Sequence, residues 1–151
     1  MQGGSVQARE IMTENPACCT PDETMQRAAQ MMKEHDCGCL PVVEDSRSKR
    51  VIGTVTDRDL ACRGLAAGKG PDTRVREVMS KDPTCCRPED DVREVEQVMA
   101  DKQVRRVPVV DARGCCVGMV AQADLARHEE VIGATEVGRV VERISEPAGR
   151  R

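Results

Sequence analysis

Apolar residues recur along this chain with two alternating periods. Met25, Ala28, Ala29 and Met32 stand at i, i+3, i+4 and i+7, which is the spacing of one apolar helix face. Val51, Ile52 and Val55 are β-branched and apolar, which is typical of a buried strand. This alternation of amphipathic helices with short strands predicts an α/β fold.

The whole pattern occurs twice. Each copy has the order strand, helix, strand, strand, helix, and the first strand of the first copy is expected at Pro16 to Cys19. A copy of roughly 60 residues is too small to bury a sound core alone, so we expect the two copies to pack against each other. The matched segments are 9–21 with 76–88, 40–43 with 107–110, and 51–60 with 116–125.

The repeat predicts the domain organisation. We expect two βαββα repeats, residues 8–66 and 75–130, related by a pseudo-twofold axis. Residues 131–151 would form a C-terminal helix and tail, because the stripe from Val137 to Ile144 lies on one helix face. The seam of a pseudo-twofold pair brings equivalent helix starts together and is a typical binding site.

The turn after the strand that ends at Val55 carries candidate chemistry. Thr56 is followed three residues later by Asp59, and this spacing is a helix-start signature. A helix N-terminus that follows a strand is also a natural seat for a phosphate group. A capped helix without any ligand is the alternative that these residues leave open.

Composition and charge exclude several classes of function. Charged residues make up 32% of the chain, but the net charge is only −3, so there is no electrostatic footprint for nucleic acid. No apolar run approaches the roughly 20 residues of a membrane span, and the N-terminus lacks the basic and apolar regions of a signal peptide. No nucleophile–base pairing is visible. We therefore expect a cytoplasmic protein that is not an enzyme and binds neither nucleic acid nor membrane.

The cysteines are unusually many and their number is odd, which argues against a disulfide framework. Adjacent residues of a strand point to opposite faces, so one member of each adjacent pair should be buried. No Cys-x-x-Cys spacing occurs, and we expect most of the thiols to be buried, reduced and unligated. A metal-binding or redox-sensing role is the alternative. The nine are Cys18, Cys19, Cys37, Cys39, Cys62, Cys85, Cys86, Cys115 and Cys116.

Four motifs in a fixed order resemble the CBS domain, named after cystathionine beta-synthase. They are Met12 to Pro16, Pro21 to Met25, Leu40 to Val43, and Gly53 to Asp59, and each has a counterpart in the second copy. Two such domains in tandem resemble a Bateman module, here most similar to small stand-alone bacterial CBS-pair proteins. The resemblance implies non-catalytic sensing of an adenine nucleotide: AMP, ADP or ATP, sometimes NAD(H) or S-adenosylmethionine. It also implies a homodimer and an effector protein that the sequence does not identify.

The resemblance also implies roles for single residues. Asp59 would accept hydrogen bonds from ribose hydroxyls, and Thr56 would lie near the phosphate. Arg105 and Arg106 would reach the phosphates from the other copy. The second copy has only Asp124, since alanine replaces the threonine there. One nucleotide should therefore dominate, bound at the Thr56–Asp59 site.

The adenine would lie against apolar groups of the two strands beside this turn. The residues concerned are Leu40 and Pro41 on one strand and Pro16 and Cys19 on the other. The chain has no Phe, Tyr or Trp to stack on a base, so the expected affinity is modest. AMP or ATP is the expected ligand, with no obligatory cofactor and no metal.

Overall fold

The computed structural model describes residues 5–128, which form an α/β fold with two three-stranded sheets. Contacts divide the chain into two compact units. Among the described residues, unit 1 combines residues 5–14 with Thr84–Asp111 and residues 117–128. Unit 2 combines Asn15–Pro83 with Ala112–Cys116. Each unit is described by itself below.

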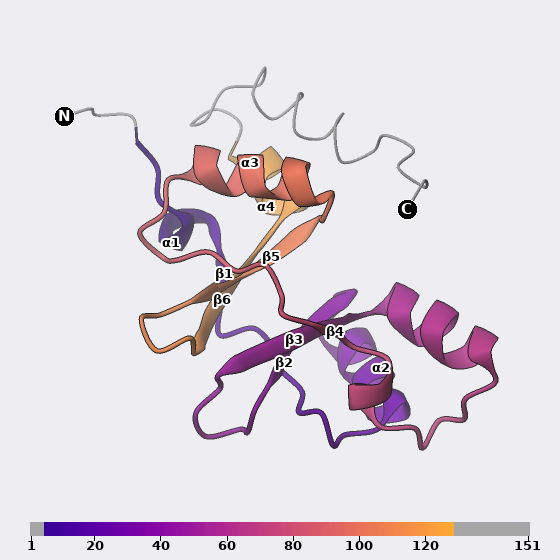
Figure 1. Cartoon of the computed structure of the whole chain (residues 1–151). Helices are drawn as coiled ribbons and strands as arrows, with labels where there is room; N and C mark the ends of the chain where they lie inside the picture. Colours follow the sequence, from indigo (N-terminus) through magenta and orange to yellow (C-terminus); the bar gives the residue numbers. More distant parts are fainter. Residues whose placement is uncertain (1–4, 129–151) are drawn as a thin grey trace. The chain divides into compact units, whose positions relative to one another are not determined.

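The sheet of unit 2 has the order β2-β3-β4. β2 (Cys39–Val43) and β3 (Val51–Thr56) form an antiparallel hairpin (Figure 1). Leu40 lies opposite Val55 in its register. β4 (Ser80–Lys81) adds the third, antiparallel strand along the other edge of β3. Two irregular helices follow β3, a π-helix at Asp59–Gly64 and a 3₁₀ turn at Leu65–Ala67, and another 3₁₀ turn spans Val75–Glu77.

Helix α2 (Met25–Glu34) covers the core of unit 2. Its buried residues are Met25, Ala28, Met31 and Met32, whereas Ala29, which was expected on the apolar face, is exposed. Thr24 begins the helix by accepting a hydrogen bond from the Arg27 N–H at 3.1 Å. The apolar side chains packed with α2 come from both strands of the hairpin and from the segment before β4: Leu40, Val42, Val55, Val75, Val78 and Met79.

Unit 1 repeats this plan with a sheet of order β1-β6-β5. Its strands are β1 (Thr13–Glu14), β5 (Arg106–Val110) and β6 (Cys116–Ala121). Its helices are α1 (Ala8–Ile11), α3 (Val92–Lys102) and α4 (Gln122–Arg127) (Figure 1). The core lies between α3, α4 and the sheet and includes Val92, Val95, Met99, Val107, Val109, Val120 and Leu125.

Equivalent backbone hydrogen bonds in the two copies confirm the repeat. The Arg76 N–H donates to the Pro21 carbonyl at 3.0 Å, and the equivalent Arg9 N–H donates to Pro88 at 3.0 Å. The segment that opens each repeat thus packs against the other repeat and supplies its third strand, β4 to β3 and β1 to β6. Left-handed residues recur in the same way, at Asn15 and Asp82 and at Asp36 and Gln103.

The expected strand at Pro16 to Cys19 is wrong, because Cys19 forms only a single parallel bridge to β2. The Cys19 N–H donates to the Pro41 carbonyl at 3.0 Å, and the Val43 N–H donates to the Cys19 carbonyl at 2.8 Å. A longer parallel ladder would need the N–H of Pro41 on one side and of Pro21 on the other, and proline has none. The equivalent bridge of the second copy joins Cys86 and Val109.

The other expected elements are confirmed at nearly the expected bounds, including both long helices and both strand hairpins. The predicted stripe from Val137 to Ile144 lies outside the described residues. Within residues 5–128, no helix is both long and apolar enough to cross a bilayer.

Candidate functional site

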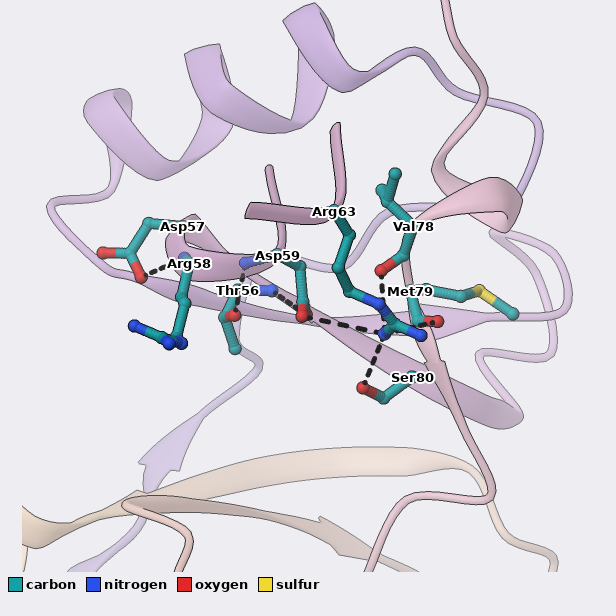
Figure 2. A network of polar contacts seen from close by, with 8 residues as sticks. All are labelled: Thr56, Asp57, Arg58, Asp59, Arg63, Val78, Met79 and Ser80. Carbon is teal, nitrogen blue, oxygen red and sulfur yellow. Dashed lines mark hydrogen bonds and ion pairs between the residues drawn. The ribbon is translucent and has the colours of Figure 1, made fainter. Parts of the chain in front are cut away.

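The turn between β3 and the following helix holds the two residues singled out from the sequence. The Asp59 N–H donates to the Thr56 hydroxyl oxygen at 3.1 Å, and the Thr56 N–H donates to Asp59 Oδ2 at 2.9 Å (Figure 2). This reciprocal pairing is a capping box, which satisfies two backbone donors at the helix start. Asp57 and Arg58, which follow Thr56, are exposed.

Arg63 is a member of this site that the sequence reasoning did not identify. Its Nη1 lies 3.8 Å from Asp59 Oδ1 and donates to the carbonyls of Val78 and Met79 at 3.2 and 3.3 Å and to the Ser80 hydroxyl at 3.3 Å (Figure 2). The i, i+4 spacing of the acidic and basic residues was a usable signal. Arg63 therefore ties the Asp59 carboxylate to the segment that leads into β4.

The pairing leaves binding capacity on both side chains. An ionised carboxylate has roughly four acceptor positions, and the Thr56 N–H and Arg63 occupy two of those on Asp59. The Asp59 side chain is 15% exposed, so its remaining lone pairs can be reached from solvent. The Thr56 hydroxyl accepts from the backbone and still has its own proton to donate. Such a site can accept two hydroxyl donors and donate to an anion.

The equivalent turn of the second copy is less open. The Ala121 N–H donates to Asp124 Oδ2 at 2.7 Å, so half of the capping box is kept without the hydroxyl. Arg127 forms an ion pair with the other carboxylate oxygen, and the Asp124 side chain is only 4% exposed. Asp124 thus has the burial and partners of a structural residue.

Arg105 and Arg106 lie at the start of β5, in unit 1. Arg105 is exposed and Arg106 half-buried. The Arg105 carbonyl accepts from the Gln122 N–H at 2.9 Å, as the Gly38 carbonyl accepts from the Asp57 N–H at 2.9 Å in unit 2. The structure therefore matches Arg105 with Gly38 in the two copies, and the reach of the arginines to the Thr56–Asp59 turn stays a prediction.

The apolar residues assigned to an adenine contact differ in exposure. The side chains of Cys19 and Leu40 are fully buried in the core of unit 2, and Pro41 is also buried. Pro16 is half-buried. The buried side chains of Leu40 and Cys19 are therefore not exposed for contact with a base, and their role in adenine binding stays a prediction.

Unit 2 also has an open pocket of about 610 Å³ that does not include Thr56 or Asp59. Its wall combines the segment after β1, the C-terminal half of α2 and the turn between β2 and β3. The polar lining residues include Cys18, Glu23, His35, Ser46 and Lys49. This pocket is therefore a second candidate site, separate from the capping-box turn.

The cysteine pairs divide as expected, because Cys19, Cys86 and Cys116 are buried while their sequence neighbours are half-buried. Fewer are buried than expected: four of nine, with Cys39 as the fourth, while Cys62 is exposed. Burial raises the pKa of Cys19 and of Cys86 to about 12, so both thiols stay protonated at neutral pH.

The described residues place the chain in a known class of α/β proteins. The CBS domain family matches residues 8–63 and residues 75–130. The chain belongs to the CBS domain family and contains two CBS domains in tandem.

Relatives of similar size support this assignment. The CBS domain-containing protein YhcV of Bacillus subtilis is 42% identical over 121 residues, which cover 80% of this chain and 84% of that protein. Hypoxic response protein 1 of Mycobacterium tuberculosis is 41% identical over 122 residues, with 80% and 83% covered. The resemblance to small stand-alone CBS-pair proteins is thereby confirmed.

Two solved structures extend the comparison to ligands. The crystal structure of Hypoxic Response Protein I with two coordinated zinc ions has a TM-score of 0.74 and 40% identity, and covers 82% of this chain and 98% of its own. The CBS domain pair of protein MJ0100 in complex with 5′-methylthioadenosine and S-adenosyl-L-methionine has a TM-score of 0.73 and 25% identity, with 82% and 94% covered.

Proposed function

We propose that this protein is a non-catalytic regulatory module that binds an adenine nucleotide at the Thr56–Asp59 turn. The observation that carries the proposal is the capping box at the end of β3, in which Asp59 keeps two acceptor positions and Thr56 keeps its proton. A ribose diol presents two adjacent donors, and a carboxylate that accepts from both holds the sugar in one orientation.

The ligands of a relative support the choice of nucleotide class. The MJ0100 pair is described in complex with 5′-methylthioadenosine and S-adenosyl-L-methionine, two molecules that share an adenosine. We infer an adenine nucleotide here, AMP or ATP in the first place, because Thr56 and the two arginines suit a phosphate. Arginine forks match phosphate oxygens in pairs, so Arg105 and Arg106 would hold the phosphates from the second repeat.

The two copies differ in the groups that such a ligand needs. Ala121 has no hydroxyl, and the Asp124 carboxylate is nearly fully buried against Arg127. The equivalents of Arg105 and Arg106 in the first copy are Gly38 and Cys39, which carry no charge. We therefore propose one dominant nucleotide per chain.

A thermal-shift screen tests the proposal. The chain is heated with AMP, ADP, ATP, NADH or S-adenosylmethionine, because a ligand that prefers the folded state raises the melting temperature with concentration. The proposal expects a dose-dependent rise with at least one adenine compound and none with GMP. A screen in which no adenine compound moves the melting temperature at millimolar concentration would contradict it.

Zinc is the ligand of one relative, and the described residues do not support it here. Hypoxic Response Protein I is described with two coordinated zinc ions. Within residues 5–128 of this chain, no three His, Cys, Asp or Glu side chains come together in a group that could hold a metal ion. Structural zinc sites usually have four such ligands. We therefore do not extend zinc binding to this chain. We propose instead a homodimeric nucleotide sensor that acts on an effector protein.

A further inference from the structure

Two cysteines far apart in the sequence meet beside the open pocket of unit 2. Cys18 lines the pocket, and Cys116 is the last residue of the segment Ala112–Cys116, which belongs to unit 2 and ends at the start of β6. The Cys116 side chain hydrogen-bonds the sulfur of Cys18. The Cys116 N–H also donates to the Lys49 carbonyl at 2.8 Å, and the Lys49 side chain lines the same pocket. Both thiols and one ammonium group thus belong to one neighbourhood.

The surroundings of Cys18 act in both directions, since its thiol donates to the Pro16 carbonyl at 3.3 Å, but their net effect is a lowered pKa. The Cys116 thiol and the charge of Lys49 lower the pKa of Cys18, and these effects outweigh the opposing effect of partial burial. The other titratable groups on the pocket wall are Glu23, whose carboxylate accepts from the Thr20 N–H at 2.7 Å, and His35. Because the pKa is lowered, a larger share of Cys18 is ionised at neutral pH than for an ordinary cysteine.

The repeat supplies an internal comparison. Cys85 is the equivalent of Cys18 in the second copy and is also half-buried, yet burial raises its pKa. The position that corresponds to Cys116 in the first copy is Val51, so only one copy combines the two thiols. Half-burial of a cysteine in the segment before each parallel bridge therefore does not by itself lower its pKa.

We propose that Cys18 and Cys116 form an oxidation site, in which a hydroperoxide converts the pair to a disulfide inside unit 2. The Cys18 thiolate attacks hydrogen peroxide, the O–O bond breaks, and Cys18 becomes a sulfenic acid, while the leaving hydroxide takes up the proton that the Cys18 thiol released on ionising and becomes water. The Cys116 sulfur then attacks the Cys18 sulfur, the S–O bond breaks, and the oxygen leaves as water with the Cys116 proton. The two thiols lose two electrons together, and hydrogen peroxide is reduced to water.

This site does not depend on the proposed nucleotide function. Neither Thr56 nor Asp59 lines the pocket, and no step above uses a nucleotide. Cys19, the neighbour of Cys18 in sequence, should react poorly with peroxide, because it is fully buried and its pKa is raised to about 12. A failure of nucleotide binding would therefore leave this inference untouched, and the reverse also holds.

The first experiment uses the fully reduced wild-type chain and asks which thiol reacts. Alkylation by iodoacetamide is followed per cysteine by mass spectrometry at neutral pH. We expect Cys18 to react at least as fast as Cys62, which is far more exposed, and several-fold faster than Cys85. Slower alkylation of Cys18 than of Cys85 would overturn the inference. The comparison is made within the wild-type chain, so misfolding of a variant cannot affect it.

The second experiment identifies the product. The reduced chain receives an equimolar amount of hydrogen peroxide, the remaining thiols are alkylated, and a non-reducing digest is sequenced by tandem mass spectrometry, which separates Cys18 from Cys19. We expect a peptide pair linked between Cys18 and Cys116. In Cys116→Ser we expect a sulfenic acid at Cys18, trapped by dimedone, whereas the control Cys85→Ser should keep the wild-type link. A first disulfide that joins Cys18 to any other cysteine would contradict the proposal.

Discussion

Replacing Asp59 by alanine removes the carboxylate that the proposed ribose contact needs. In the structure one carboxylate oxygen accepts from the Thr56 N–H at 2.9 Å and the other faces Arg63 at 3.8 Å, which leaves two acceptor positions for a diol. Hydrogen bonds to a charged group contribute about 1.5–3 kcal/mol each. The loss of two of them should weaken binding by at least about a hundredfold, since about 1.4 kcal/mol corresponds to a factor of ten.

The matched control is Asp124→Ala in the second copy. Both substitutions remove the same kind of backbone hydrogen bond, from Thr56 at 2.9 Å or from Ala121 at 2.7 Å, so both should lower the free energy of unfolding by about 0.5–2 kcal/mol. Only Asp59→Ala should remove nucleotide binding. The assay is titration calorimetry with the nucleotide found in the thermal screen, alongside urea unfolding of each variant.

The outcome that refutes this reasoning is specific. If Asp124→Ala abolishes binding while Asp59→Ala leaves the dissociation constant within about threefold of the wild type, the proposed site is the wrong one of the two. Equal loss in both variants would show that the two copies bind as a pair, which contradicts the asymmetry derived from Ala121 and Arg127.

Two further predictions concern stability and are measured by urea unfolding. Leu40→Ala should cost about 2–5 kcal/mol because Leu40 is fully buried, whereas Leu65→Ala, at a residue 74% exposed, should stay within about 0.5 kcal/mol of the wild type. Gly53→Ala should cost about 1–3 kcal/mol, because the added Cβ would lie 2.4 Å from a backbone carbonyl oxygen of β4, whereas Gly70→Ala meets nothing within 4 Å and should be neutral. Equal costs within either pair would contradict the packing described here.

Local features of the fold could be predicted from the sequence because they depend on neighbours in the chain. The helix over 25–34 ends where its apolar spacing ends, and the capping box at Thr56 and Asp59 needs only residues three positions apart. The division of the cysteine pairs into buried and half-buried members follows from the alternation of an extended chain.

The pairing of distant segments could not be predicted in the same way. β1 pairs with β6 and β4 with β3, and no local periodicity records that each opening segment joins the other repeat. The strand expected at Pro16 to Cys19 failed because its ladder with β2 is limited by Pro21 on one side and, on the other, by Pro41, which lies on the neighbouring strand. The meeting of Cys18 with Cys116 was invisible for the same reason, since only the folded chain brings them together.

The central claim is that one adenine nucleotide binds per chain, at the first copy. The most direct measurement is isothermal titration of the wild-type chain with AMP and, separately, ATP, analysed for stoichiometry. The account predicts a single class of sites with one nucleotide per chain. Two equivalent sites per chain, or no heat of binding with either nucleotide at millimolar concentration, would contradict it.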